Sequence, residues 1–93
     1  EAPEEVVLIT CGVDVQKDRL ECERVGWGVG LESWSLDYQI FVGSPSQPEV
    51  WEQLDAYLQR PSLSKLGLHL EVSGCAIDSG GHHTQEVYDF CLL

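Results

Sequence analysis

Two apolar runs, each ended by an aspartate, constrain the fold of this chain most strongly. The first run, Val-Val-Leu-Ile-Thr-Cys-Gly-Val over residues 6–13, is followed by Asp14, and a second run over residues 68–77 is followed by Asp78. The first run does not alternate with polar residues, which is typical of a strand that is covered on both faces. We therefore expect residues 6–13 to form a central strand of a sheet and residues 68–77 to form a further strand.

Two more strands are predicted between these runs. Residues 19–28 carry apolar side chains at Leu20 and Cys22, and the glycines on either side of Trp27 indicate a bulge. Residues 33–42 alternate between apolar and polar side chains, which predicts a strand covered on one face. The apolar members of this alternation are Trp34, Leu36, Tyr38, Ile40 and Val42. Because short turns separate the first three strands, we expect an antiparallel meander.

A helix is predicted after the third strand. Ser46-Gln47-Pro48-Glu49 has the spacing of a capping box with a proline in the first turn, and Pro61 stops a helix that runs to about Arg60. Residues 62–67 read as a loop, and a last helix is expected from about Thr84. The apolar residues expected on the first helix are Val50, Trp51, Leu54, Tyr57 and Leu58, and those on the last are Val87, Tyr88 and Cys91.

The composition fits one small folded domain that is part of a longer protein. Ninety-three residues, of which 43% are hydrophobic, are enough for a single packed core. The chain begins at Glu1, contains no methionine and stops inside the last predicted helix. We therefore expect both ends to be cuts and read residues 1–93 as one partial domain.

The cysteines and the hydropathy pattern indicate where the protein resides. The four cysteines form no C-x-x-C pair, which indicates buried free thiols in a reducing cytosol. No stretch approaches the roughly 20 apolar residues of a membrane span, and the acidic start is unlike a signal peptide. We expect a soluble protein of the cytoplasm with no membrane partner.

The formal net charge of −11 restricts the partners of this chain. A surface that binds nucleic acid through its phosphates should be basic, so the charge argues against a self-sufficient nucleic-acid binder. Bound divalent cations would reverse the sign locally, and a partner segment could carry a basic groove. The charge taken alone favours a domain that docks on another protein.

The order of the predicted elements brings Asp14 and Asp78 together. A strand, helix, strand unit in one sheet almost always leaves its two strands parallel. If the strand that ends at Asp78 lies beside the first strand, the two carboxyl ends are about 4.8 Å apart. Neighbouring carboxylates repel each other, so a cation is expected between them.

Ligands that are all oxygen atoms select hard cations such as Mg²⁺ or Mn²⁺. A pair of such ions about 3.5–4 Å apart activates a water and stabilises the leaving oxygen of a phosphodiester. Gly80 and Gly81 would let a phosphate backbone come close to Asp78. A purely structural alternative stays open, in which Asp14 caps a turn and Asp78 opens an Asx turn.

The histidines and the remaining acids are weaker candidates. His82 and His83 lie at an expected helix entrance, where one could orient a phosphate or support a metal ligand while the other is exposed or caps the helix. His69 is expected to be structural, and the spacing of the histidines and cysteines does not fit a zinc site. Glu21 or Glu23, on the strand beside the first, could lean toward the two aspartates.

The same residues resemble a known family, the C-terminal nuclease domain of lambda-type phage terminase large subunits, which has an RNase H-like fold. The matching blocks are residues 9–16, 18–21, 25–28, 32–34, 76–85 and 87–91, which together cover nearly the whole chain. Blocks of this length are far more specific than a lone D-S-G-G. The resemblance implies an α/β partial domain, with a three-stranded antiparallel meander followed by a helix, a parallel strand and a helix.

In such terminases an ATPase motor domain pumps viral DNA into a procapsid, and the nuclease domain cuts the concatemer into genome units. The resemblance implies that Asp14 and Asp78 are catalytic metal ligands of an endonuclease for double-stranded DNA. It also implies a terminase small subunit and the portal or procapsid as partners, in the host-cell cytoplasm. The motor is expected elsewhere, because no G-x-x-x-x-G-K-[ST] loop is present, and a further catalytic acid is expected beyond residue 93.

Two other classes of function are compatible with parts of the pattern. The segments around Asp14 and Asp78 resemble the phosphate loops of actin-like and sugar-kinase ATPases. Those loops usually follow the first aspartate with glycine and a hydroxyl residue, whereas Val15 and Gln16 follow here. The third class is a non-catalytic acidic domain that docks on a capsid or a partner subunit. Such a domain has no reason to bind Mn²⁺ through the two aspartates.

Overall fold

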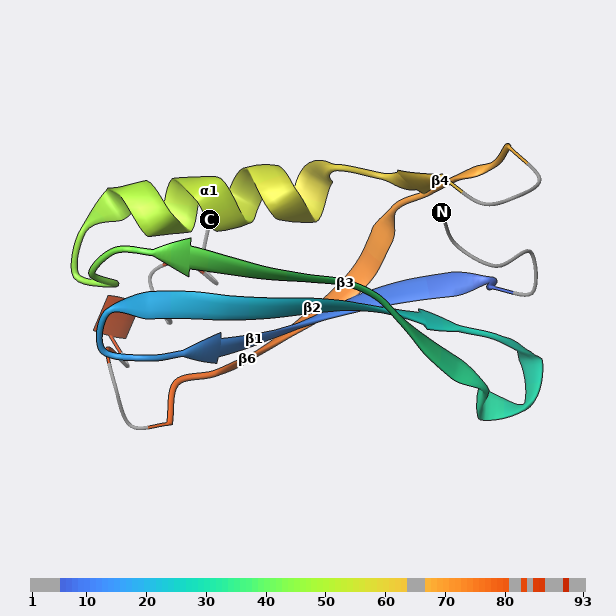
Figure 1. Cartoon of the computed structure of the whole chain (residues 1–93), viewed down its shortest axis with the longest axis horizontal. Coiled ribbons are helices and arrows are strands. Elements are labelled where there is room, and N and C mark those ends of the chain that lie inside the picture. Colours follow the sequence, from blue (N-terminus) through green and yellow to red (C-terminus); the bar gives the residue numbers. More distant parts are fainter. Residues whose placement is uncertain (1–5, 64–66, 81–82, 84, 87–89, 91–93) are drawn as a thin grey trace.

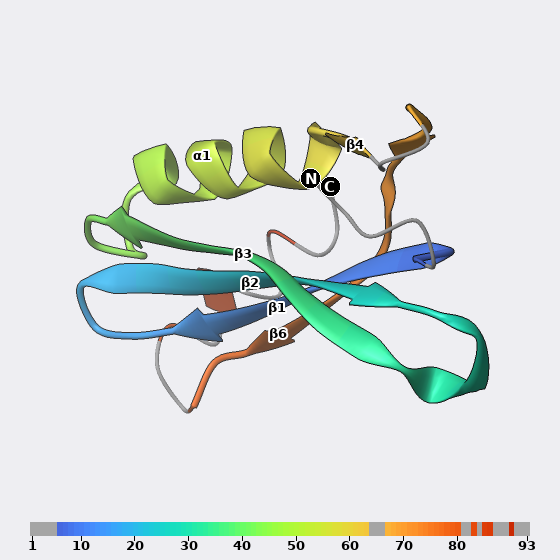
Figure 2. The same cartoon turned by 45° about the vertical axis from the view of Figure 1, so that its right-hand side comes forward.

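A computed structural model describes residues 6–63, 67–80, 83, 85–86 and 90 of the chain. Four strands form one sheet in the order β3-β2-β1-β6, and α1 runs along one face of it (Figures 1 and 2). The elements are β1 (Leu8–Val15), β2 (Arg19–Trp27), the 3-10 turn η1 (Val29–Leu31), β3 (Ser33–Val42), α1 (Pro48–Gln59), β4 (Ser62–Leu63), β5 (His69–Leu70) and β6 (Val72–Asp78). Within these ranges no helix has the length and apolarity that crossing a bilayer requires.

The sheet is mixed, and β1 occupies an inner position in it. β1 pairs antiparallel with β2 and parallel with β6, and β2 pairs antiparallel with β3. The predicted meander and the parallel strand that returns beside β1 are therefore confirmed. Of the expected last helix, Gln85, Glu86 and Phe90 are helical, and Val87, Tyr88 and Cys91 lie outside the described residues.

The main core lies between α1 and the sheet face that α1 covers. Leu54 of α1 and Leu20 of β2 are fully buried, and the Trp51 indole N–H donates to the Pro45 carbonyl at 2.8 Å. The buried set is Cys11, Val13, Val15, Leu20, Cys22, Val50, Trp51, Leu54 and Tyr57. Leu58 packs against this set from its edge. The apolar helix face that the sequence spacing predicts is confirmed.

The prediction that β1 is covered on both faces is wrong for the described residues. Side chains of β1 alternate between buried and accessible positions, with Leu8, Gly12 and Asp14 exposed on the face opposite to α1. We call this the open face of the sheet. Single apolar side chains are tolerated at a surface, so a run without polar residues does not require two covering layers. Trp27 shields part of the open face, where its indole N–H donates to the Thr10 hydroxyl at 2.9 Å.

A bulge in β3 overturns the prediction of one covered apolar face on this strand. The register with β2 shifts between Arg24 and Val25, which leaves Leu36 as an extra residue. Trp34 and Leu36 pack against a small cluster of Val6 and Ile9. The apolar residues that follow, Tyr38, Ile40 and Val42, lie on the open face and are 55%, 45% and 79% exposed.

The start of α1 differs from the predicted capping box. Gln47 is the N-cap residue and makes no side-chain cap hydrogen bond, and the helix begins at Pro48. Ser46 belongs instead to the preceding turn, where its backbone N–H donates to the Ser44 hydroxyl at 3.2 Å. Proline suits the first helical position because the N–H that it lacks would have no partner inside the helix.

The second apolar run is divided between two elements. Part of it forms the short hairpin of β4 and β5, in which His69 is exposed, and the predicted loop at residues 62–67 contains β4. The rest forms β6, which is an edge strand of the described sheet. Cys75 is therefore exposed, contrary to the expectation of a buried thiol, whereas Cys11 and Cys22 are buried.

Gly26 marks a place in β2 where a side chain has no room. A Cβ there would lie 2.8 Å from Val6 Cγ2 and 3.1 Å from Leu36 Cδ1. Gly26→Ala should therefore lower the free energy of unfolding by about 1–3 kcal/mol, measured by urea denaturation. The control is Gly12→Ala on the open face, where a Cβ meets nothing within 4 Å, and it should change stability by less than about 0.5 kcal/mol. Equal losses in the two variants would contradict this packing.

Candidate functional site

Asp14 and Asp78 are direct register partners on the adjacent parallel strands β1 and β6. Both side chains are exposed on the open face, because their neighbours Val13 and Ile77 belong to the core beneath α1. Paired strands lie about 4.8 Å apart. The predicted meeting of the two aspartates is therefore confirmed, while their role as metal ligands stays a prediction.

An irregularity in β6 decides this pairing. Ile9 is opposite Val72 but Thr10 is opposite Gly74, so Ser73 is an extra residue in β6. Continuing the register of Ile9 and Val72 without this extra residue would place the core residue Ile77 opposite Asp14. The bulge therefore brings two carboxylates side by side.

Each aspartate accepts a hydrogen bond from an uncharged donor. Gln16 Nε2 donates to Asp14 Oδ2 at 3.1 Å, and the Gly80 backbone N–H donates to Asp78 Oδ1 at 2.9 Å. Gly80 has φ 57°, in the left-handed region that favours glycine, so Asp78 does open an Asx turn. Among the described residues no lysine or arginine pairs with either carboxylate. Within the described part of the chain, the two carboxylates thus lie next to each other without a paired cationic side chain.

Glu21 extends the row of carboxylates to a third strand. It is the register partner of Asp14 on β2. Its carboxylate accepts hydrogen bonds from the Tyr38 hydroxyl and from Arg19 Nε, the latter at 2.6 Å. The hydrogen bond from Tyr38, followed in size by the one from Arg19, holds the pKa of Glu21 below its ordinary value. The hydrogen bond to Glu21 in turn raises the pKa of Tyr38. Glu21 is therefore opposite Asp14 but is already engaged on both oxygens.

The carboxylate oxygens of Asp14 and Asp78 are of the chemical type that binds a hard cation. Carboxylate oxygens are the ligands that Mg²⁺ and Mn²⁺ prefer, and the juxtaposed charges of Asp14 and Asp78 would be relieved by such an ion. Within the part of the chain that the structure describes, no group of three or more His, Cys, Asp or Glu side chains is arranged to hold a metal ion. The described residues therefore offer two candidate ligands and not a complete coordination sphere.

The other predicted site residues are only partly described. Gly81 and His82 lie outside the described residues. His83 is half-buried with φ 52°, and its Nδ1 lies 3.6 Å from Glu86 Oε2 three residues later. The roles expected for the two histidines stay predictions.

Sequence reasoning did not identify two residues with defined polar roles. Gln16, which holds Asp14, has no signal beyond its proximity in the chain. Arg24 does have a signal, because it occupies a buried position in the β2 alternation of Leu20, Cys22 and Gly26. A basic residue on the core face of a strand requires polar partners inside the protein.

Comparisons with known proteins identify relatives of this chain. Residues 1–92 match the family model described as the endonuclease domain of the terminase large subunit gpA. The chain is 32% identical over 87 residues to the terminase large subunit of Escherichia phage lambda, an alignment that covers 94% of this chain and 14% of that protein. The terminase large subunit of Enterobacteria phage P21 is 31% identical over 86 residues, which is 92% of this chain and 13% of that protein. No solved structure matches the chain significantly.

The family match includes every strand of the four-stranded sheet and both aspartates at its open face. It rests on the length of the chain and not on a short motif. The chain belongs to the family of endonuclease domains of terminase large subunits.

Proposed function

We propose that this chain is the first part of a metal-dependent endonuclease domain that cuts concatemeric double-stranded DNA during genome packaging. The observation that carries the proposal is the register pairing of Asp14 with Asp78, in a chain of the terminase endonuclease family. The chain covers 14% and 13% of the two phage relatives, so the activities of a whole terminase are proposed only for a longer protein that contains it.

We propose that the complete domain lies at the C-terminal end of the large subunit and has an RNase H-like fold. Three features support this fold. The first three strands form an antiparallel meander, α1 crosses over one face, and β6 returns parallel to β1. Both strands of that parallel pair carry an aspartate at the carboxyl end, where ligands bind in open α/β sheets.

The two aspartates would hold Mg²⁺ or Mn²⁺ through the carboxylate oxygens that Gln16 and Gly80 leave unoccupied. When bound, one or two such ions would activate water and stabilise the leaving oxygen of a phosphodiester. The donors on Asp14 and Asp78 fix how the carboxylates are turned, which is how outer hydrogen bonds tune a metal site. A further acid beyond residue 93 completes the ligand set in this proposal, with Gly81 and His82 or His83 near the phosphate.

The net charge of the chain restricts which partners we propose for it. A net charge of −11 opposes binding of DNA by this chain alone, so the basic groove for double-stranded DNA is assigned to another part of the longer protein. The small subunit and the portal or procapsid, in the host-cell cytoplasm, follow from the same family-based proposal. The charge also favours the second candidate function, an acidic docking domain without catalysis. Metal binding separates the two, because docking does not need Asp14 and Asp78 as ligands.

Mn²⁺ titration of the 93-residue chain, followed by paramagnetic broadening of amide NMR signals, tests the metal site. Broadening should begin at residues 12–15 and 76–79. Asp14→Asn or Asp78→Asn should lower the affinity for Mn²⁺ about 10-fold or more, since each removes a proposed ligand. Glu23→Gln is the matched control, because Glu23 is opposite Gly12 and not opposite either aspartate, its carboxylate accepts from the Ser35 hydroxyl instead of leaning toward them, and its loss changes the charge equally. Equal weakening by Glu23→Gln would show that charge alone attracts the ion and would overturn the site.

Cleavage itself is tested in a longer terminase subunit that carries this chain. Asp14→Asn there should abolish cutting of concatemeric DNA while leaving ATP hydrolysis by the motor intact. Cutting at the unaltered rate would refute the catalytic role of Asp14. The Glu23→Gln protein again serves as the control and should retain cutting.

The Tyr38 hydroxyl is expected to control the ionisation of Glu21. Tyr38→Phe removes the first cause of the lowered pKa, so the pKa of Glu21 should rise, measured by NMR titration of the side-chain carboxyl carbon. Because folding lowers this pKa, Glu21 stabilises the fold above its unfolded pKa of about 4.3, and this contribution is lost as the pH falls through the lower folded value. The control is Ser35→Ala, which removes the hydroxyl that donates to Glu23 and should leave the pKa of Glu21 unchanged.

A further inference from the structure

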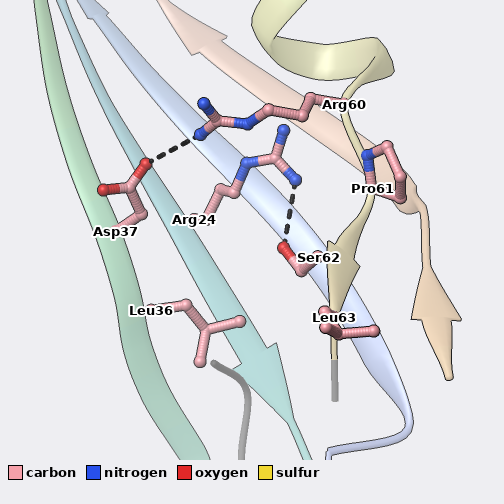
Figure 3. Close-up of a pocket in the computed structure, with 7 residues that line it drawn as sticks. All are labelled: Arg24, Leu36, Asp37, Arg60, Pro61, Ser62 and Leu63. Carbon is pink, nitrogen blue, oxygen red and sulfur yellow. Dashed lines mark hydrogen bonds and ion pairs between the residues drawn. The ribbon is translucent and has the colours of Figure 1, made fainter. Parts of the chain in front are cut away.

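A pocket of about 420 Å³ lies on the α1 side of the sheet (Figure 3). It is formed where the C-terminal end of α1 and β4 meet β2 and β3. Its lining residues are Arg24, Leu36, Asp37, Arg60, Pro61, Ser62 and Leu63. Arg24 belongs to the buried face of β2, whereas Asp14 and Asp78 lie on the open face, so the pocket is separate from the candidate metal site.

Arg24 brings a buried positive charge to this pocket, and none of the acidic residues that the structure describes pairs with it. Its side chain is 1% exposed, and its two terminal nitrogens donate to the Ser62 hydroxyl, at 3.2 Å, and to the Tyr57 carbonyl. Its Nε has no hydrogen-bond partner among the described residues. Asp37 is the register partner of Arg24 on β3, but its carboxylate accepts from the Tyr57 hydroxyl and from Arg60 instead. A buried charge with neutral partners is costly, and a nearby anion would reduce that cost.

Arg60 adds a second guanidinium to the same place. The guanidinium carbons of Arg24 and Arg60 lie 4.6 and 5.2 Å from the centre of the Tyr57 ring. Burial, followed by the hydrogen bond to Asp37, raises the pKa of Tyr57, so its hydroxyl stays neutral and does not offset them. Two of the five basic residues of a chain with net charge −11 thus converge beside one acid.

We propose that this pocket binds an oxyanion, a carboxylate or a phosphate group. Arg60 and Ser62 make the direct contacts, and the charge of Arg24 acts from the pocket floor. The Ser62 oxygen accepts from Arg24, so its own hydroxyl hydrogen is available to a ligand. The Arg60 side chain is 61% exposed and pairs with Asp37 at 3.3 Å. Because it is exposed, its planar guanidinium can turn two N–H donors toward an anion.

The test is a titration of the 93-residue chain with sodium phosphate and, in a second arm, sodium acetate, at constant ionic strength. The NMR signals of the arginine side-chain N–H groups are followed. Saturable shifts of the Arg24 and Arg60 signals are expected with at least one of the two anions. Saturation by phosphate alone indicates a phosphate group as the ligand, and saturation by acetate indicates a carboxylate.

Two variants give the expected losses. Arg60→Gln should weaken the binding about 10-fold, the size of one charge-assisted contact. Ser62→Ala should weaken it by a smaller factor, and the Tyr57 carbonyl still accepts from Arg24 in this variant. Arg19→Gln removes the same charge from a guanidinium that already pairs with Asp18 and Glu21, and it should bind the anion like the unaltered chain.

Shifts that grow linearly with both anions, or equal weakening by Arg19→Gln and Arg60→Gln, would overturn the proposal in favour of general ion screening. Arg60→Gln and Ser62→Ala leave Asp14, Asp78 and the Arg19–Glu21 pair beside Asp14 unaltered. Their Mn²⁺ broadening should therefore be unchanged, which keeps failure of the anion site distinct from failure of the nuclease proposal.

Discussion

The parallel pairing of β6 with β1 is the contact on which both the sheet and the candidate site depend. It makes β1 an inner strand that is hydrogen-bonded on both sides, and it closes the core under α1 through Val72 and Ile77. The same register places Asp78 beside Asp14. Stability and the geometry of the candidate site are therefore coupled in one strand pair, because a slip of one residue would expose a core side chain and separate the two carboxylates.

The two faces of the sheet have different chemical characters. Among the described residues, the buried side chains beneath α1 are apolar apart from Arg24, whose charge is held by Tyr57 and Ser62 at the end of the helix. The open face carries carboxylates in register across β6, β1 and β2, with Glu21 already engaged by its neighbours. An acidic surface attracts cations, and the pair of aspartates at the strand ends places two carboxylates on neighbouring strands.

Much of the fold could be predicted because it follows from local patterns. The alternation over residues 33–42 gives the bounds of β3, and the spacing of Val50, Trp51 and Leu54 gives the buried face of α1. The two bulges could not be predicted in this way. Leu36 and Ser73 each shift the register by one residue, and an extra residue leaves the composition of a strand unchanged while it reverses which face the following side chains occupy.

The sequence by itself determined the order of the four sheet strands and α1, and the two aspartates that end apolar runs, because strand propensity and helical spacing are properties of neighbouring residues. It also determined the family, since the matching blocks are long. The tertiary structure alone decided that one face of the sheet is open, that Gln16 and Gly80 hold the two carboxylates, and that Arg24 meets Arg60 in a pocket. Those contacts join residues through strand pairing and helix packing, whose distances are set by the whole fold.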